Sequence, residues 1–598
     1  MRQFEHFPNL VTMFFVRAAE KGEAPFLWHK RDGAWVAMGW REAAARVAAL
    51  AASLEALGLE PGDRVMLVSE NRPEWCIADL AIMAAGCVTV PTYTSNTARD
   101  HEHILADSGA RAVIVSTAKL AATLIPAVLR AGQCRIVIGI DAMRIGQVGA
   151  FAFETFASLA TPDGAGDGAV AARAQAARAI GRDALACLIY TSGTGGAPRG
   201  VMQHHGAILH NVAATPRIIA EDFGWGEEVF LSFLPLSHAY EHSAGQHLPI
   251  GLGAQIYYAE GLEKLAANIE EVRPTIMVVV PRLFEVLRTR IAKAITKQGA
   301  VPAWLLGQAT AMPERPKPWQ RPMDLLLSAT IRRKVGKRFG GRLKALVSGG
   351  APLNPDVGRF FASLGIMMLQ GYGQTEAAPV ISCNRPKAGI TLDGVGPPLD
   401  GVELRIAEDG EIQVRGELVM HGYWRNPEET ARVLSADGWL STGDIGHLDG
   451  AGRLVITDRK KDIIVNDKGD NVAPQRIEGM LTLQPEIVQA MVAGDRRPYL
   501  VGLVVPDPEW RAEWAARHDV ATDAALDGNP DFVRAIQAAV DRVNADLSNV
   551  EKVRRVLIVA EAFTIENEQL TPSMKIRRHM IRAAYGPRLD ALYKAAAY

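Results

Sequence analysis

The sequence predicts an α/β protein with a large N-terminal domain of helix-covered sheets, a β-rich subdomain within it, and a small α+β C-terminal domain. Three observations support this prediction. Helix patterns alternate with short apolar runs from residue 40 onward, which is typical of parallel sheets covered by helices. At residue 394 the composition changes to short strands broken by Gly-Pro, Asp-Gly and Asn-Pro pairs, and the charged junction TDRKKDII follows. We therefore expect a large domain at 1–457, its β-rich part at 394–457, a junction at 458–463 and a small domain at 464–598.

The bulk composition narrows the class of protein. At 598 residues the chain is too long for one hydrophobic core, and 65 basic against 66 acidic residues do not favour nucleic-acid binding. The chain has no uncharged apolar run of about 18 residues, and its start lacks a basic segment followed by an apolar one. We therefore expect a cytoplasmic protein. The five cysteines lack metal-ligand spacing, so we expect them to be reduced and mostly buried.

The N-terminal part gives the clearest alternation of helix and strand. Residues 40–57 have an amphipathic helical pattern, and residues 64–68 form a short apolar run after a Pro-Gly turn. Residues 161–182 are rich in Ala, Gly and Asp without a strong apolar face, so we expect a surface connection there. The alternation continues with expected helices at 73–85 and 98–108 and expected strands at 88–91 and 112–115.

The stretch YTSGTGGAPRG at residues 190–200 has the composition of a phosphate-binding loop. It lies between an expected strand at 184–189 and an expected helix at 207–220. Its glycines let backbone N–H groups turn toward one point, its hydroxyls donate hydrogen bonds, and Arg199 adds a fixed charge. It is not a GxxxxGK[ST] loop, because no Lys-Ser or Lys-Thr follows the last glycine. We expect it to bind polyphosphate, with a flexible surface turn as the alternative.

Two further turns follow expected strands, at residues 345–353 (ALVSGGAPL) and 367–376 (MMLQGYGQTE). Ligands bind at the carboxyl ends of strands in an open α/β sheet, so we expect these turns and the glycine loop to converge on one site. Tyr372 offers a flat face for adenine, Thr375 a donor to phosphate, and Glu376 an oxygen ligand for the Mg²⁺ that accompanies ATP. The alternative is a plain turn at the end of a strand.

Three polar residues elsewhere have ordinary structural interpretations when taken alone. His238, in the segment LPLSHAYEH, can be a hydrogen-bonded structural residue. Asp444, in WLSTGDIG, can be a turn former, and Lys575, in LTPSMKIRR, can be a surface charge. The residues alone leave these alternatives open.

These motifs, in this order, resemble those of the adenylate-forming superfamily, which comprises acyl-CoA synthetases, luciferases and nonribosomal peptide adenylation domains. The resemblance covers residues 10–578, and LPLSH, DRKKD and TPSMK are most similar to AMP-forming long-chain fatty acid CoA ligases. The chain departs from the family's TSGT-TG-x-PKG loop at two positions. Gly195 stands where the family has threonine, and Arg199 where it has lysine. Because arginine keeps the charge and can bind two phosphate oxygens, we expect binding to survive.

The resemblance implies a reaction and a set of residues. The reaction is ATP-dependent activation of a medium- to long-chain fatty acid to acyl-AMP and then acyl-CoA, with ATP, Mg²⁺ and coenzyme A required and AMP and pyrophosphate released. Catalytic roles fall to Lys575, Glu376, Thr191 and Arg199, and metal-ligand roles to Glu376 and Thr191. Nucleotide-binding roles fall to Ser192, Gly193, Thr194, Gly350, Ala351, Tyr372, Thr375, Asp444 and Arg459. Substrate-binding roles fall to His238, Gly349 and Gly371, and the hinge role falls to Lys461.

Two alternatives remain at this point. The protein could pass the acyl group from the adenylate to a carrier protein, or it could be a non-catalytic nucleotide-binding homologue with an altered loop. We expect neither, because no carrier-like domain follows residue 598 and because Glu376, Asp444, Arg459 and Lys575 are intact. Acyl chain length, CoA-binding residues and oligomeric state stay open.

One charge run stands apart from these motifs. Residues 315–344 hold ten Lys or Arg against a single acid, Asp324, with three leucines beside it. A basic amphipathic helix can lie on an anionic membrane, so peripheral membrane contact is one interpretation. A helix solvated on one face is the simpler interpretation.

Overall fold

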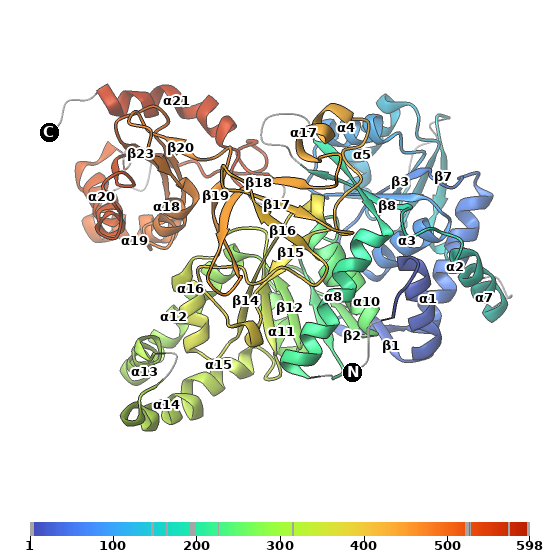
Figure 1. The fold of residues 1–598 in the computed structure, drawn as a ribbon, viewed down its shortest axis with the longest axis horizontal. Helices are drawn as coiled ribbons and strands as arrows, with labels where there is room; N and C mark the ends of the chain where they lie inside the picture. The colour runs from blue at the N-terminus through green and yellow to red at the C-terminus, as the bar shows by residue number, and fades with distance from the viewer. Residues whose placement is uncertain are drawn as a thin grey trace. The chain divides into compact units, whose positions relative to one another are not determined.

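The computed structural model describes residues 5–144, 149–162, 166–191, 198–224, 226–313, 316–520, 526, 528–571 and 575–594. The chain divides into two compact units, coloured along the sequence in Figure 1. Unit 1 comprises Met1–Arg405, Gln413–Thr442 and Leu448–Val455, and unit 2 comprises Ile406–Ile412, Gly443–His447 and Ile456–Tyr598. The predicted junction at 458–463 stays a prediction.

Unit 1 contains a seven-stranded sheet with the strand order β7-β6-β5-β3-β4-β8-β9. Neighbouring strands pair in parallel except β8 and β9, which form an antiparallel hairpin. The expected strands at 64–68, 88–91 and 112–115 are confirmed as β3, β4 and β5. The bounds are β3 (Arg64–Val68), β4 (Val88–Thr92), β5 (Ala112–Val115), β6 (Ile136–Gly139), β7 (Ala152–Thr155), β8 (Leu185–Thr191) and β9 (Arg199–His204).

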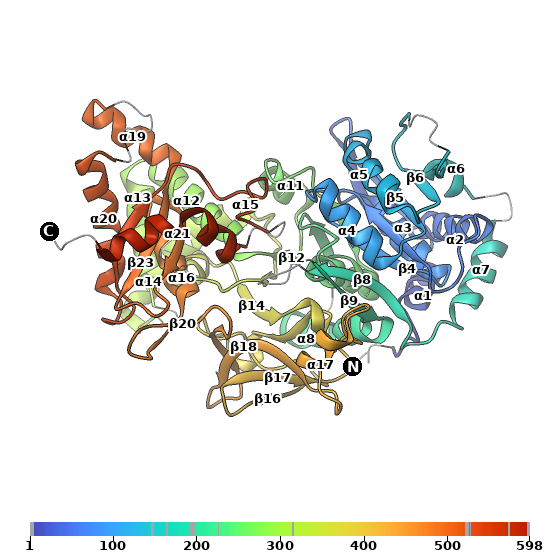
Figure 2. The ribbon, with the colours of Figure 1, turned by 90° about the horizontal axis from the view of Figure 1, so that it is seen from above.

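Helices cover both faces of this sheet (Figure 2). Val65 and Leu67 of β3 belong to one core with α1, α2 and α3, whereas Met66 and Val68 belong to a second core with α4 and α5. Burial on both faces explains why residues 65–68 of β3 and 112–115 of β5 are continuous apolar runs. The helices are α1 (Leu10–Lys21), α2 (Trp40–Ala56), α3 (Pro73–Ala84), α4 (Ala98–Ser108), α5 (Ala118–Ala131), α6 (Phe156–Leu159) and α7 (Gly166–Ala177), and those expected at 40–57, 73–85 and 98–108 are confirmed.

One expectation in this part of the chain is wrong. The described residues of 161–182 form a surface connection, as expected, and this connection contains the helix α7, because a run of alanines favours helix even where only one residue, Ala177, is buried. The glycine loop, in contrast to our expectation, does not lead directly into a helix. The strand β9 comes first and pairs with β8, and the helix α8 (His205–Phe223) follows it.

A second sheet of unit 1 has eight strands in the order β15-β14-β13-β12-β10-β11-β1-β2. Its central strands pair in parallel, and its two ends, β14–β15 and β1–β2, pair antiparallel. The LPLSH segment follows β10, the ALVSGGAPL segment contains β13 and the turn after it, and the YGQTE segment contains the end of β14 and the turn after it. The glycine loop joins β8 and β9 of the seven-stranded sheet, so the three turns that we expect to converge on one site come from two different sheets. The bounds are β1 (Pro25–Arg31), β2 (Ala34–Gly39), β10 (Val229–Ser232), β11 (Gln255–Tyr258), β12 (Ile276–Val279), β13 (Ala345–Ser348), β14 (Met368–Gly373) and β15 (Val380–Cys383).

Apart from η5 and α17, the remaining helices of unit 1 lie in the segments that connect strands of the eight-stranded sheet. The π-helix η1 (His242–His247) continues α9, and a second π-helix, η3 (Ser328–Arg332), joins α14 to α15. The other bounds are α9 (Ala239–Glu241), α10 (Leu248–Leu252), α11 (Leu265–Val272), α12 (Pro281–Thr296), α13 (Ala300–Ala311), η2 (Pro318–Gln320), α14 (Arg321–Leu327), α15 (Arg333–Arg338), α16 (Pro355–Ser363), η4 (Thr375–Ala377), η5 (Pro386–Ala388) and α17 (Pro427–Val433).

A four-stranded sheet in the order β16-β17-β18-β19 follows in the chain. Its short strands are separated by turns, as the change of composition at residue 394 predicts. The bounds are β16 (Glu403–Ile406), β17 (Glu411–Arg415), β18 (Leu440–Leu448) and β19 (Leu454–Arg459).

Unit 2 has the predicted α+β character, with a three-stranded sheet in the order β22-β23-β24. Successive residues of β23 point into different cores: Val504 packs with α18, α19 and α20, and Leu503 packs with α21. The bounds are β20 (Ile464–Val465), β21 (Asn471–Val472), α18 (Pro474–Leu481), β22 (Ile487–Ala493), β23 (Leu500–Pro506), α19 (Pro508–His518), α20 (Pro530–Ala545), β24 (Val553–Ile558) and α21 (Arg578–Lys594).

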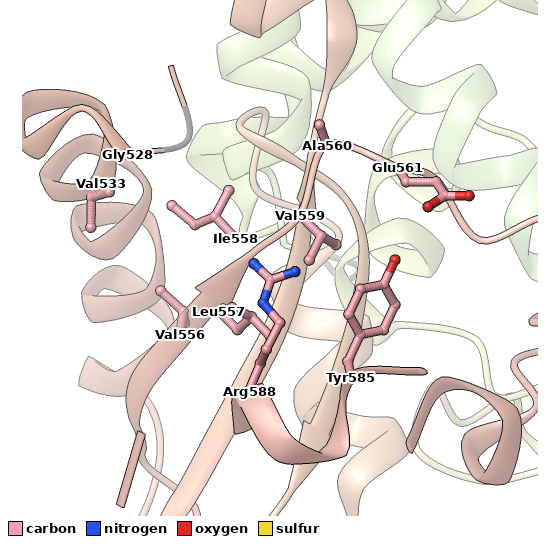
Figure 3. Close-up of a pocket in the computed structure, with 10 residues that line it drawn as sticks. All are labelled: Gly528, Val533, Val556, Leu557, Ile558, Val559, Ala560, Glu561, Tyr585 and Arg588. Atoms are coloured by element: carbon pink, nitrogen blue, oxygen red, sulfur yellow. The ribbon is translucent and has the colours of Figure 1, made fainter. Parts of the chain in front are cut away.

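A pocket of about 550 Å³ lies within unit 2, lined by residues of α20, β24 and α21 (Figure 3). Apolar side chains of β24 form much of its lining, and Tyr585 and Arg588 of α21 add polar atoms. The lining includes no predicted site residue.

Two expectations from composition can be compared with the described residues. Four of the five cysteines are buried, as expected, and Cys383 is partly exposed. Within the described ranges, no helix is both long enough and apolar enough to cross a membrane.

Candidate active site

The β8–β9 hairpin holds the two ends of the predicted phosphate loop. Thr191 ends β8 and Arg199 begins β9, and the two residues face each other across the antiparallel ladder. Ser192, Gly193 and Thr194 lie outside the described residues, so their predicted roles stay predictions. The hairpin fixes both ends of the loop to the edge of the seven-stranded sheet.

The Arg199 side chain lies against an aromatic ring and a carboxylate. Its Nη1 donates to Glu429 Oε2 at 2.7 Å, and its guanidinium carbon lies 4.4 Å from the centre of the Tyr423 ring. Its Nε is buried and has no hydrogen-bond partner among the described residues. A buried N–H without a partner is costly, so this atom can donate to an anion that enters the site.

Tyr423 links Arg199 to Glu376. The Tyr423 hydroxyl donates to Glu376 Oε1 at 2.8 Å, and burial together with this carboxylate raises the pKa of Tyr423. Since the phenol therefore stays protonated, it remains a donor to Glu376. Glu376 Oε2 makes no hydrogen bond within the described part of the chain. The carboxylate is thus oriented through one oxygen and can offer the other to a cation.

Gln203 of β9 connects the two sheets beside this site. Its Nε2 donates to the backbone oxygen of Thr375 at 2.7 Å, and the N–H of Met420 donates to the backbone oxygen of Glu376 at 2.9 Å. The turn that carries Thr375 and Glu376 is therefore held by β9 on one side and by residue 420 on the other. The structure brings Thr191, Arg199, Thr375 and Glu376 to one region even though they come from two sheets.

The turn after β13 is closely packed against Tyr240. The Tyr240 hydroxyl donates to Val347 O at 2.8 Å, and a Cβ on Gly349 would lie 3.0 Å from Tyr240 Cζ. Gly350 has a φ of +84°, which favours glycine, and Ala351 is exposed. Glycine thus avoids backbone strain at position 350 and crowding against the Tyr240 ring at position 349.

His238 directly precedes the helix α9. Its Nδ1 accepts a hydrogen bond from Tyr240 N at 3.1 Å, so it serves as the N-cap of this short helix. Tyr372 and Gly371 belong to β14, and Tyr372 is 9% exposed. Their predicted ligand-binding roles stay predictions.

A buried polar cluster follows α9. Glu241 is 1% exposed and accepts a hydrogen bond from Ser232 Oγ at 2.6 Å, and burial raises the pKa of Glu241 to about 8. His242 Nε2 lies 2.9 Å from Asp79 Oδ2. Burial alone would raise the pKa of Asp79, but the charge and hydrogen bond of His242 outweigh it and hold this pKa below its usual range.

Asp444 and Arg459 lie together in unit 2. Arg459 Nε is 3.2 Å from Asp444 Oδ1, and the Asp444 side chain is 6% exposed against 42% for Arg459. They occupy the neighbouring strands β18 and β19. The next residue, Lys460, pairs with Asp409 at 2.6 Å and Glu411 at 2.9 Å.

The two predicted functional lysines of unit 2 have exposed side chains. Lys461 follows β19, and the N–H of Lys575 donates to Thr571 Oγ1 at 3.0 Å. The backbone oxygen of Lys575 accepts from Thr571 N at 2.8 Å, so two hydrogen bonds hold these two residues together. Residues 572–574 lie outside the described residues.

Sequence reasoning missed four residues that hold the site together. They do so through contacts between distant parts of the chain, and no local motif marks them. They are Gln203, Tyr240, Tyr423 and Glu429.

The chain matches the AMP-binding enzyme family over residues 14–424 and the AMP-binding enzyme C-terminal domain over residues 461–597. The first match alone covers more than half of the chain. The protein therefore belongs to the AMP-binding enzyme family.

Its relatives include proteins named for one reaction. The chain is 32% identical to the long-chain-fatty-acid–CoA ligase FadD15 of Mycobacterium bovis, covering 98% of this chain and 97% of that one. It is 31% identical to the peroxisomal long chain acyl-CoA synthetase 7 of Arabidopsis thaliana over 94% of this chain and 81% of that one. It is 30% identical to the human long-chain-fatty-acid–CoA ligase 6 over 88% of this chain and 78% of that one.

Solved structures agree on the fold. The adenylation domain of a carboxylic acid reductase from Segniliparus rugosus, in complex with AMP and a co-purified carboxylic acid, has a TM-score of 0.78 at 22% identity, covering 99% of this chain and 95% of that one. The adenylation domain of a Mycobacterium chelonae carboxylate reductase has a TM-score of 0.75 at 24% identity, covering 98% and 91%.

Proposed function

We propose that the protein activates a carboxylic acid with ATP to an acyl-adenylate and pyrophosphate, and then transfers the acyl group to coenzyme A with release of AMP. The observation that carries this proposal is the chain of contacts from Arg199 through Tyr423 to Glu376. The Arg199 guanidinium, which suits phosphate, lies over the face of the Tyr423 ring. The Glu376 carboxylate, which suits a divalent cation, accepts a hydrogen bond from the hydroxyl of the same ring. ATP with its metal ion presents both charges at once.

The chemistry explains why such a site is sufficient. A carboxylate is a poor acyl donor because its leaving group would be an oxide, and attack of its oxygen on the α-phosphate replaces that group with AMP. The transition state spreads negative charge over the phosphoryl oxygens, so positioned donors are the main catalytic help. We assign this help to Arg199, Thr191 and Lys575. No protein nucleophile is needed.

The residues present fit a magnesium ion. Glu376 offers a carboxylate oxygen that makes no hydrogen bond to any described residue, and Thr191 is a hydroxyl residue at the end of β8. Hard oxygen donors are what Mg²⁺ prefers, and bound Mg²⁺ neutralises phosphate charge. Tyr423 would hold the other Glu376 oxygen in place, which keeps the metal-binding oxygen oriented.

The other predicted roles belong to the same proposal. We assign nucleotide binding to Ser192, Gly193, Thr194, Gly350, Ala351, Tyr372, Thr375, Asp444 and Arg459, acyl binding to His238, Gly349 and Gly371, and the hinge to Lys461 within 458–463. The crowding of Gly349 against Tyr240 supports a pocket wall at this point, since a side chain there would displace the ring.

We propose a medium- to long-chain fatty acid as the substrate. The names of the relatives from Mycobacterium, Arabidopsis and human support this substrate class. Burial of a fatty chain contributes about 0.8 kcal/mol per methylene, so affinity should rise with chain length until the pocket ends.

The test is a reconstituted assay of both half-reactions. The protein is incubated with ATP, Mg²⁺, coenzyme A and fatty acids of about eight to eighteen carbons, and AMP, pyrophosphate and acyl-CoA are measured. We expect equal amounts of AMP and acyl-CoA, with kcat/KM increasing with chain length. Formation of acyl-adenylate without acyl-CoA would favour transfer to a carrier protein. Binding of ATP without turnover would favour a non-catalytic homologue.

A further inference from the structure

We propose that unit 1 carries a docking face for an anionic lipid bilayer, formed by α13, η2 and the continuous helix α14-η3-α15. It extends the proposed function by naming the surface from which an apolar substrate would be taken. We call it the apolar–basic face. Its apolar part consists of Val301, Trp304, Trp319, Leu325 and Leu326, and its basic part of Arg321, Arg333, Lys334 and Lys337.

The apolar part of the face brings many exposed hydrophobic residues together in a short stretch of the chain. Five of the 13 exposed large hydrophobic residues among the described residues fall between residues 301 and 326. Trp319 is 72% exposed and Leu325 70%. Exposed apolar residues are ordinary when scattered singly, but a cluster marks an interaction surface.

The helix α13 is apolar yet exposed. Its sequence AVPAWLLGQATA has no charged residue, and only Ala309 is buried. Val301 and Trp304 are three residues apart, so they lie on one side of the helix, and both are exposed. Figure 1 shows α13 beside α14 at the margin of unit 1, and the two helices are in contact. A helix of this composition on a surface indicates a partner with an apolar interior.

The continuous helix supplies the positive charge on its outer side. Leu327, Ile331 and Val335 are buried and follow one another at intervals of four, so they define the inner side. A second row is spaced by four or eight residues and displaced by two residues from the first. It consists of Arg321, Leu325, Arg333 and Lys337. Two residues correspond to more than half a helical turn, so this row points away from the core.

These charges are available to a partner. Arg321, Arg333, Lys334 and Lys337 make no ion pair with any described residue. The single acid of the run, Asp324, is already paired with Arg332 at 2.6 Å. Exposed tryptophans suit the boundary between headgroups and acyl chains, and lysine and arginine suit anionic headgroups. The charge therefore favours an anionic bilayer over a second copy of this chain, which would repel this face.

The test is sedimentation with vesicles, without ATP, coenzyme A or fatty acid, so its outcome is independent of the proposed reaction. We expect binding to vesicles of phosphatidylcholine with phosphatidylglycerol, and weak binding to phosphatidylcholine alone. The double variants Trp304→Gln/Trp319→Gln and Arg333→Glu/Lys337→Glu should each bind about tenfold or more weakly. Their turnover of a short, soluble fatty acid in lipid-free buffer should match that of the parent, which also shows that they fold.

Two matched controls change similar residues elsewhere. Leu262→Gln removes a leucine that is 66% exposed, and Arg99→Glu/Lys119→Glu reverses two exposed charges. Both should bind vesicles as the parent does. Equal vesicle binding by parent and face variants would overturn the proposal. So would an oligomer of the parent that dissociates in the tryptophan variant without lipid, because this face would then join copies of the chain.

Discussion

At the scale of single residues, the charge of the Glu376 carboxylate and its orientation by the hydrogen bond from Tyr423 can be tested by separate substitutions. Glu376→Gln keeps the shape of the side chain and removes the charge that a metal ion needs. We expect adenylate formation to fall by about 10²–10³ at limiting Mg²⁺, and higher Mg²⁺ to restore part of it. The measurement is fatty-acid-dependent pyrophosphate release over a range of Mg²⁺ concentrations.

Tyr423→Phe is the matched control for this variant. It keeps the carboxylate and loses only the 2.8 Å hydrogen bond to it, which is worth about 1.5–3 kcal/mol for a charged acceptor. Because the metal-binding oxygen is then less well oriented, we expect a loss of about tenfold to a hundredfold at limiting Mg²⁺, smaller than that of Glu376→Gln and more fully restored by higher Mg²⁺. Unchanged turnover of Glu376→Gln at limiting Mg²⁺ would contradict a metal-binding role for Glu376.

The sequence could locate some residues of this site and not others, for a physical reason. Arg199 and Glu376 lie in short motifs whose residue types already express the chemistry of phosphate and metal binding. Tyr423 is 47 positions along the chain from Glu376, and its own segment carries no catalytic signature. Its position depends on the pairing of residues 420–424 with β9, which only the folded chain defines.

At the scale of elements, strands and helices with strict periodicity could be predicted from sequence. The parallel strands β3, β4 and β5 are buried on both faces, and residues 65–68 of β3 and 112–115 of β5 are uninterrupted apolar runs, whereas β4 contains two threonines. β9 was missed because its buried positions come in adjacent pairs and do not alternate. α7 was missed because its alanines supply helix propensity without an apolar face.

The helix α9 gives a prediction on pH and stability. Glu241 has its pKa raised to about 8 by burial, so between pH 4.5 and 8 the folded chain holds a proton that the unfolded chain has released. This difference lowers stability as pH rises through that range. Glu241→Gln removes the difference. We therefore expect the free energy of unfolding of Glu241→Gln, relative to the parent, to increase from pH 5 to pH 8 in urea titrations.

Buried histidines have the opposite effect on the pH dependence of stability, because they lower the free energy of unfolding as the pH falls. Burial lowers the pKa of His205 to about 3 and that of His247 to about 4, so protons bind the unfolded chain first as pH falls below 6.5. The parent and Glu241→Gln should therefore both lose stability as the pH falls below 6.5. Glu263→Gln, at an exposed glutamate, is the control and should follow the parent at every pH. A pH-independent difference for Glu241→Gln would mean that Glu241 is ionised in the folded protein.

At the scale of the whole molecule, the proposed function uses Lys575 of unit 2 in adenylate formation and not in transfer of the acyl group to coenzyme A. If the Lys575 ammonium stabilises only the adenylation transition state, Lys575→Ala should lose about 10²–10³ in adenylate formation. Conversion of supplied acyl-AMP and coenzyme A to acyl-CoA should stay near the parent rate. The assay compares ATP-dependent pyrophosphate release with acyl-CoA release from chemically made acyl-AMP.

Lys468→Ala changes another exposed lysine of unit 2 and should affect neither half-reaction. Equal damage to both half-reactions by Lys575→Ala would refute a role confined to adenylation. A melting curve would then distinguish a lysine used in both steps from an unfolded unit 2.

The burial of the cysteines has a consequence for chemical selectivity. An acyl-adenylate is a mixed anhydride that acylates any thiolate within reach, including those of the protein that made it. Cys383 lies in β15, beside the strand β14 that leads into the candidate active site. Cys383 is partly exposed as a residue, but burial of its thiol raises the pKa to about 12, so the thiol stays largely un-ionised at neutral pH. Burial likewise raises the pKa of Cys87 to about 12 and that of Cys134 to about 11. The enzyme is thereby protected from modifying itself, and the activated acyl group is kept for a thiol that arrives from solution.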